Sequence, residues 1–267
     1  MSHPPLKLSS PATREFWELP VPYEDAELLA VDKPSRLLSS PDRYDKDRPS
    51  LMGMIHRDLQ RAAPWTVQRQ LTYLANVHRL DFETSGLLLL AKSKPSLVNL
   101  VNQFGAKKPV KQYLTLVHGW PEEDAFEVNV KLAPHPERPE LMVPSPKRGK
   151  FSVTRFKVLE RFVGYALLEC EPLTGRTHQI RVHLKTKGLP VVGDKLYGGQ
   201  PMLLSEFKPD YRLKPGREEQ PLISRVALHA WKLQVTHPVS GEPVAIETEL
   251  AKDLRVALKY LRQLAKR

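Results

Sequence analysis

The chain has 267 residues, 41% of them hydrophobic, which is enough for one large domain or two small ones with a sizeable core. Its 41 Lys and Arg against 30 Asp and Glu give a net charge of +11, which favours a polyanionic partner, nucleic acid before an anionic membrane. Cys170 is the only cysteine, which excludes an intrachain disulfide and a cysteine cluster for zinc. No apolar run approaches about 18 residues, so we expect no membrane span. No secretory signal is recognisable, and the composition fits a cytoplasmic protein.

The N-terminal third contains few regular patterns before residue 78. Residues 1–20 hold several prolines and serines, and we expect an irregular arm there. Residues 27–31 are typical of a strand that ends at Asp32-Lys33-Pro34. Residues 41–50 indicate a solvated loop, and residues 51–61 can form a short amphipathic helix that ends before Pro64.

Residues 78–86, H-R-L-D-F-E-T-S-G, run directly into the apolar residues 87–91. A short apolar run bounded by turn residues is typical of a buried strand. Asp81 then lies at the polar entrance of that strand, two residues from Arg79, where a fold can hold a side chain still and leave it reachable. The alternative is that Asp81 only caps the turn at Thr84-Ser85-Gly86.

Two regular elements and a connection follow. Residues 95–104 predict a helix capped by Ser93, with Leu97, Leu100, Val101 and Phe104 on a core-facing side. Residues 110–119 alternate like a strand, in which Tyr113 could be an ordinary half-buried tyrosine. The proline-rich and charged residues 133–150 indicate an exposed connection, and residues 151–159 again alternate like a strand.

The last third alternates turns with regular elements. We expect a strand over 165–170, a helix over 177–187 and a structural turn over 193–198. Residues 204–221 indicate an inserted surface loop, a strand begins at Leu228, and leucines from 250 to 264 form the stripe of an amphipathic helix that packs on a sheet. His178 and His183 are five residues apart, which is the wrong spacing for a metal pair on one helical face, so we expect no metal.

Four separated segments, in order, resemble the RluA-type pseudouridine synthases. The pattern H-R-L-D-x-x-T-S-G-L-L-L is complete at 78–89, and T-G-R-x-H-Q-I-R-V-H is complete at 174–183. K-x-Y-x-A-x-V-x-G matches at 111–119 with Thr115 in place of Ala, and L-H-A at 228–230 precedes His237-Pro238. Residues 193–198 also resemble G-D-x-x-Y-G. So many specified positions in one order form a strong signal.

The resemblance implies an α+β pseudouridine synthase fold, with a long mixed, mostly antiparallel sheet, flanking helices and a central basic cleft. It implies one catalytic domain over 21–267, preceded by the arm at 1–20, which is too short to be the separate N-terminal RNA-binding module of many relatives. The relatives also carry N-K-P-x-G-L, where this chain has Asp32 for Asn and Arg36 for Gly. We therefore expect that the backbone freedom of glycine is not required at Arg36.

The resemblance also assigns roles to residues. Asp81 would be the catalytic aspartate, Tyr113 the ring that stacks on the target base, and Arg181 the ion-pair partner of Asp81. Substrate-binding roles would fall to His78, Arg79, Arg176 and Leu228: Arg79 would occupy the space that a flipped base vacates, Arg176 would approach the RNA backbone, and Leu228 would line the base pocket. The residues alone leave alternatives open, since Arg181 could make a weak exposed pair and Leu228 could be ordinary core.

The implied activity is the isomerisation of uridine to pseudouridine in a stem-loop of ribosomal or transfer RNA, by a monomeric enzyme that needs no cofactor or metal. Asp81 would act as nucleophile or as base, and the sequence does not choose between them. The main alternative is a non-catalytic RNA-binding or ribosome-assembly protein on the same fold, which the basic charge would explain equally. An RNA methyltransferase would need a cofactor loop, and none is recognisable.

Overall fold

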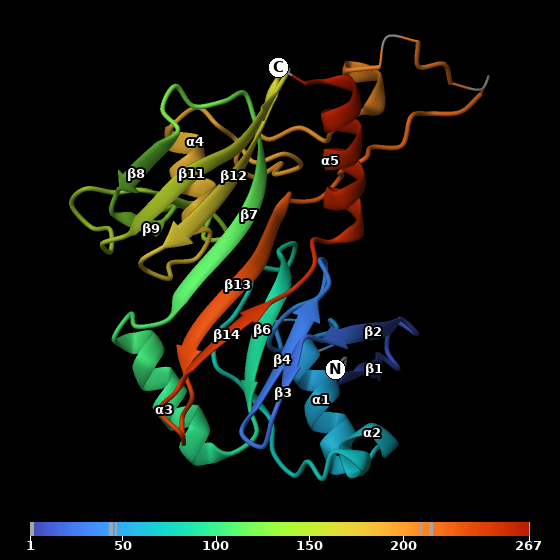
Figure 1. The fold of residues 1–267 in the computed structure, drawn as a ribbon, viewed down its shortest axis with the longest axis vertical. Coiled ribbons are helices and arrows are strands. Elements are labelled where there is room, and N and C mark those ends of the chain that lie inside the picture. Colours follow the sequence, from blue (N-terminus) through green and yellow to red (C-terminus); the bar gives the residue numbers. More distant parts are fainter. Residues whose placement is uncertain (1–2, 43–44, 46, 209, 214–215, 267) are drawn as a thin grey trace. The chain divides into compact units, whose positions relative to one another are not determined.

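The computed structural model describes residues 3–42, 45, 47–208, 210–213 and 216–266. The chain forms two compact units, of which the first contains residues 1–111 and 230–249 and the second contains residues 112–229 and 250–267. The chain passes between them within strands β7 (Val110–His118) and β13 (Leu228–Thr236) and again just before helix α5 (Lys252–Leu264) (Figure 1). The single domain expected over 21–267 stays a prediction.

The first unit is built on a sheet around strand β6 (Ser85–Ala91), all seven residues of which are buried. Strand β4 (Leu28–Lys33) pairs antiparallel with β6, from Leu28 opposite Ala91 to Lys33 opposite Gly86. The short strands β3 (Tyr23–Glu24) and β5 (Ala75–Asn76) pair with β4 and β6, and β14 (Pro243–Glu247) pairs with β13. The strands expected over 27–31 and 87–91 are confirmed.

Three helices complete this unit: α1 (Leu51–Gln60), α2 (Pro64–Gln68) and α3 (Lys94–Gly105). The predicted cap of α3 is confirmed, because the side chain of Ser93 accepts a hydrogen bond from the Ser96 amide. Leu100 of this helix is fully buried, whereas Val101 is 47% exposed. The apolar side of α3 is therefore narrower than we expected.

The N-terminal residues are not an irregular arm, and this expectation was wrong. Strands β1 (His3–Ser9) and β2 (Phe16–Val21) form an antiparallel pair, with Leu6 opposite Leu19. Leu6, Leu8 and Leu19 are fully buried. The alternation of leucines with polar residues, which is a strand pattern, outweighs the prolines in this segment.

The second unit contains an antiparallel sheet in the order β7, β12 (Tyr165–Pro172), β11 (Val153–Phe162) and β8 (Ala125–Asn129). Helix α4 (Gln179–Thr186) contacts β11 and β12, and a short 3-10 turn, η1, covers Leu204–Glu206. Leu254, Leu258 and Leu261 of α5 pack into the same core as Leu116 and Leu168 of the sheet, which confirms the predicted C-terminal helix.

Two expectations for the second unit need correction. Residues 133–150 are not only a connection, since β9 (Leu132–Pro134) and β10 (Met142–Pro144) pair as a short antiparallel ribbon. Helix α4 begins at residue 179 rather than 177, because His178 has a positive φ of 53° and cannot be part of it. In the loop expected over 204–221, residues 209, 214 and 215 lie outside the described residues.

Candidate active site

The loop that carries Asp81 joins β5 to β6 in the first unit. Asp81 is half-buried, four residues before a strand that is buried along its whole length. The Thr84 amide donates to the Asp81 carbonyl at 3.2 Å, which closes the turn into the strand. The structure confirms that this side chain stands at the entrance of a buried strand, and Arg79 is exposed on the same loop.

The backbone on both sides of Asp81 is fixed by residues from a distant segment. The Ser39 hydroxyl donates to the Leu80 carbonyl and accepts from the Leu80 amide, at 3.0 Å each. The Arg36 amide donates to the Phe82 carbonyl at 2.7 Å. Because the carbonyls of the residues before and after Asp81 are both held, its Cα has little freedom to move.

Arg36 itself was predicted wrongly. Its φ is +60°, so the backbone adopts the left-handed conformation for which glycine is favoured, and the turn keeps this geometry although the residue is arginine. The neighbouring Lys33 is fully buried, and its ammonium donates to the carbonyls of Pro34 and Leu37 at 2.8 Å each. These bonds hold the turn in the shape that brings the Arg36 amide to the loop.

His78 supports the loop from the other side. Its ring stacks on Phe104 with the centroids 5.1 Å apart, and its Nε2 accepts a hydrogen bond from the Leu89 amide at 3.2 Å. Burial, and then the charge of Lys111, lowers the pKa of His78 to about 4, so the ring is neutral at pH 7. Its contacts in the unit are those of a structural support, and its predicted contact with substrate stays a prediction.

Gly86 at the start of β6 explains why the motif contains glycine. Its φ is +110°, and a Cβ at this position would lie 2.2 Å from the carbonyl oxygen of Ala230 on β13. Only glycine therefore lets these two strands approach so closely just after the Asp81 loop.

In the second unit, Tyr113 and Leu228 belong to one hydrophobic cluster. Tyr113 is half-buried on β7, opposite Cys170 of β12, and Leu228 is 4% exposed at the start of β13. The Leu116 amide and the Thr115 hydroxyl both donate to the Ala227 carbonyl, which ties the start of β13 to β7. Leu228 is thus a core residue, and its predicted place in a base pocket stays a prediction.

Arg181 is buried on α4 and makes a two-pronged ion pair. Its Nε lies 2.7 Å from Oδ2 of Asp194, and its Nη2 lies 2.8 Å from Oδ1 of the same carboxylate. Its exposed fraction is 4% and that of Asp194 is 0%. The guanidinium carbon also lies 5.0 Å from the centre of the Tyr197 ring. The alternative of a weak exposed pair for Arg181 is therefore wrong.

Asp194 and Tyr197 were missed as functional candidates, since residues 193–198 were interpreted only as a structural turn. A signal was present, because a buried arginine needs a counter-charge, and Asp194 is an acid in a turn that follows the helix of Arg181.

A buried polar network fixes α4 to strand β11. The side-chain oxygen of Gln179 accepts from the Thr174 hydroxyl and the Arg176 amide, while its nitrogen donates to the Val153 carbonyl. His183 lies between the hydroxyls of Ser152 and Thr154, 2.9 Å from each. Burial lowers the pKa of His183 to about 4. The network sets the register of the helix that carries Arg181 and the turn that carries Arg176.

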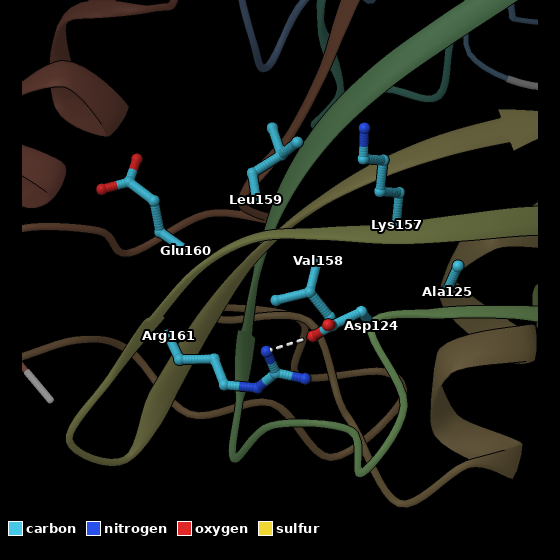
Figure 2. A pocket seen from close by; sticks show the side chains of 7 residues that line it. All are labelled: Asp124, Ala125, Lys157, Val158, Leu159, Glu160 and Arg161. Carbon is cyan, nitrogen blue, oxygen red and sulfur yellow. Dashed lines mark hydrogen bonds and ion pairs between the residues drawn. The ribbon is translucent and has the colours of Figure 1, made fainter.

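The structure places His78, Arg79 and Asp81 in the first unit and Tyr113, Arg176, Arg181 and Leu228 in the second. That the two groups form one active site stays a prediction of the resemblance. A pocket over β8 and β11 contains none of these residues (Figure 2). Three of its charged groups are engaged in ion pairs, since Arg161 binds Asp124 and Glu160 binds Arg262 of α5. This pocket is therefore not a candidate site.

Two absences hold for the described part of the chain. No group of three or more His, Cys, Asp and Glu side chains there could hold a metal ion. None of the helices there has the length and apolar character needed to cross a membrane.

Comparison with known proteins gives one consistent result. Residues 27–186 match the RNA pseudouridylate synthase family. The chain is 36% identical to the ribosomal large subunit pseudouridine synthase D of Xanthomonas campestris, over 92% of this chain and 70% of that protein. It is 33% identical to the dual-specificity RNA pseudouridine synthase RluA of Escherichia coli O157:H7, over 88% of this chain and 94% of that protein.

A solved structure, that of human RNA pseudouridylate synthase domain containing 4, has a TM-score of 0.68 to this chain at 22% identity and covers 91% of this chain and 92% of its own. The α+β fold that the sequence resemblance implied is confirmed by this likeness.

Proposed function

Because the chain belongs to the RNA pseudouridine synthase family and is therefore an isomerase that acts on uridine in RNA, we propose that Asp81, Tyr113 and Arg181 carry out its chemistry. The observation that carries this proposal is the fixed position of Asp81. Asp81 is half-buried at the entrance of a fully buried strand, and the carbonyls of Leu80 and Phe82 on either side of it accept hydrogen bonds from residues 39 and 36. An acid that only capped a turn would not need such support.

The proposed reaction exchanges one bond to the sugar for another. The bond between N1 of uracil and C1′ of ribose breaks, the uracil turns, and a bond between C5 and C1′ forms. The hydrogen on C5 leaves as a proton, and N1 gains a proton, so no oxidant, reductant or energy source is needed. Asp81 acts in this sequence either as nucleophile on the nucleotide or as base on the sugar.

The target base must leave its stack before the reaction, since its atoms cannot be reached inside a helix. Tyr113 then offers an aromatic face, and stacking of a base on such a face contributes about 1–3 kcal/mol. Arg79 is exposed on the same loop as Asp81 and occupies the space that the base has left. Arg176 contacts the RNA backbone, and Leu228 adds an apolar wall to the base pocket.

Arg181 is proposed to hold Asp81 ionised and oriented. An arginine has five N–H donors in a planar fork, more than one carboxylate accepts, so Arg181 can bind Asp194 and Asp81 at the same time. The bond to Asp194 fixes the plane of the guanidinium, and Asp81 binds the remaining N–H groups in that plane.

The substrate is proposed to be a stem-loop of ribosomal or transfer RNA. One relative is named for the ribosomal large subunit and another for dual specificity. The net charge of +11 suits a polyanion, and we expect the enzyme to act in the cytoplasm as a monomer, a state that light scattering can check.

The test is Asp81→Asn, assayed by the release of tritium from transcripts of bacterial large-subunit ribosomal RNA and transfer RNA made with uridine tritiated at C5. We expect the rate to fall by at least about a thousandfold, because no other group replaces the carboxylate. Binding to the same transcripts should change by less than about threefold, since the variant keeps the shape of the side chain.

The matched control is Glu83→Gln, which removes another carboxylate of the same loop. Glu83 lies 3.8 Å from Arg36 in a partly exposed pair, so its loss should change the rate by less than about twofold. Normal turnover by Asp81→Asn would show that the acid has been assigned wrongly.

A further inference from the structure

The guanidinium of Arg181 is held from two directions by one turn. Asp194 binds it in its plane through Nε and Nη2, and the ring of Tyr197 lies 5.0 Å from its central carbon. A two-pronged bond to a carboxylate fixes the plane of an arginine, and a ring against its face restricts tilting. Together these contacts define the orientation of the group within the second unit.

The turn that carries both residues is rigid. The Asp194 carbonyl accepts from the amides of Tyr197 and Gly199 at 3.0 and 2.9 Å. A Cβ on Gly199 would lie 1.8 Å from the carbonyl oxygen of Val191, and Gly193 has a φ of +74°. Substitution of either glycine would open the turn, so the backbone geometry here serves to place Asp194 and Tyr197.

The hydroxyl of Tyr197 is also fixed. It accepts a hydrogen bond from the Met142 amide of β10 at 2.9 Å and lies 2.9 Å from Nδ1 of His178. His178 directly precedes α4, the helix of Arg181. The ring therefore bridges β10 and the start of α4, and it cannot rotate away from the guanidinium without breaking both contacts.

We propose that Asp194 and Tyr197 are positioning residues, which set the orientation of the Arg181 guanidinium and act on the reaction through it. This inference rests on the proposed role of Arg181 toward Asp81. A buried ion pair alone is weak evidence for a contribution to stability, since apolar residues of the same volume often serve as well. Apolar residues could not replace this pair, because they could not orient the Arg181 guanidinium toward Asp81.

A second two-pronged arginine–aspartate pair, here called a fork like that of Arg181 and Asp194, lies in the same unit and provides a matched comparison. Arg225 binds Asp253 through the same two nitrogens at the same distances, 2.7 and 2.8 Å. Its Nη1 donates to the backbone carbonyls of Val226 and Leu228, at 2.9 and 3.2 Å. The Arg225 fork therefore holds the backbone to α5, which is a structural task.

The experiment compares Asp194→Asn and Asp253→Asn, each alone, and places Asp194→Asn in an Arg181→Lys background. Single-turnover tritium release from large-subunit ribosomal and transfer RNA transcripts gives the maximal rate and the half-saturating enzyme concentration, both corrected for the folded fraction. We expect Asp194→Asn to lower the maximal rate about 10- to 100-fold, because a misaligned group loses most of its effect, with half-saturation unchanged within about threefold. Asp253→Asn should lower the midpoint of thermal unfolding and leave the rate per folded molecule unchanged.

In the Arg181→Lys background, Asp194→Asn should lower the maximal rate by less than a further factor of about two, because the pair through which Asp194 acts is already lost. Should Asp194→Asn fold poorly, Asp194→Glu retains the charge but shifts the carboxylate, and the same loss of maximal rate is expected.

The inference is overturned if Asp194→Asn is no slower per folded molecule than Asp253→Asn, or if its effect multiplies fully with that of Arg181→Lys. If Arg181→Lys is slow and Asp194→Asn is not, only the positioning role fails. If Arg181→Lys keeps the normal rate, the proposed function of Arg181 fails first, and the positioning role fails with it.

Discussion

Two arginine–aspartate forks in the second unit have the same hydrogen-bond geometry and, in our account, different tasks. Arg181 and Arg225 are both 4% exposed and both bind a carboxylate through Nε and Nη2. Asp194 is fully buried in a turn, whereas 31% of the Asp253 side chain is exposed on α5. The hydrogen-bond geometry of the fork therefore does not distinguish a functional arginine from a structural one. In our account the surroundings of each arginine make that distinction.

The other contacts of the two guanidinium groups also differ. Nη1 of Arg225 donates to two backbone carbonyls, whereas the face of the Arg181 guanidinium lies against the ring of Tyr197. Burial acts to raise the pKa of Asp253, but the hydrogen bonds and charge of Arg225 outweigh burial and lower it. The comparison predicts that equal changes in the two forks have unequal consequences for rate and for stability.

The largest expected difference comes from Arg181→Lys and Arg225→Lys. Lysine keeps the charge but cannot make the fork, so Arg181→Lys should lower the rate of pseudouridine formation by about 100-fold or more. Arg225→Lys should leave the rate per folded molecule within about threefold and lower the free energy of unfolding by about 1–3 kcal/mol. Tritium release and urea denaturation measure the two effects, and equal rate losses in both variants would remove the distinction between the forks.

A smaller effect is a difference in the pH range over which the surroundings of each fork change the stability of the protein. The pKa of His183, which lies on α4 near Arg181, is about 4 in the folded chain against an ordinary value of 6.5. Above pH 6.5 the ring is therefore neutral in the folded and the unfolded chain, and it does not affect stability. As the pH falls from 6.5 to 4, the unfolded chain binds a proton that the folded chain excludes, and stability falls by up to about 3 kcal/mol. Asp253 has a lowered pKa, so its contribution is present above its ordinary 3.8 and is lost below it.

Thermal unfolding of His183→Gln and Asp253→Asn from pH 7 to pH 3 checks these windows. His183→Gln should weaken the loss between pH 6.5 and 4, with the remainder coming from His78, whose pKa is also about 4. Asp253→Asn should lower the unfolding midpoint throughout the range above its ordinary pKa of 3.8 and should weaken the fall below it, because the contribution of the ion pair is already missing. A His183→Gln curve that parallels the wild type would show that this ring is not buried neutral.

The smallest effect concerns the ring over Arg181. Tyr197→Leu removes the aromatic face and the hydroxyl, and we expect the rate to fall about 3- to 10-fold, since a ring over a cation contributes about 0.5–2 kcal/mol. Tyr197→Phe keeps the face and loses only the two hydroxyl contacts, so its loss should be smaller. A larger loss for Phe than for Leu would contradict a role for the ring face.

The sequence was sufficient where a local pattern decides the structure. The apolar run at 87–91 and the cap at Ser93 predicted β6 and α3, because buried strands and helix starts follow from neighbouring residues. It failed at residues 1–20, where prolines hid the alternation of Leu6 and Leu8, and at 133–150, where β9 and β10 are only three residues long and each ends in proline.

The site was predictable in its main residues and not in their support. The resemblance directed attention to Asp81 and Arg181, but no local pattern shows that Ser39 holds the Leu80 peptide group. Asp194 could be recognised as the counter-charge of Arg181 only once that arginine was known to be buried. Both contacts join segments that are distant along the chain or separated by a turn. Arg36 shows the opposite limit, since its left-handed backbone is imposed by contacts with the loop and not by its residue type.

The most direct test of the central claim is pseudouridine mapping of total RNA from cells that lack this gene. We predict that one or more uridines in ribosomal or transfer RNA lose the modification, and that the wild-type chain restores it while Asp81→Asn does not. Restoration by Asp81→Asn, or an unchanged pseudouridine map in the deleted cells, would contradict the account.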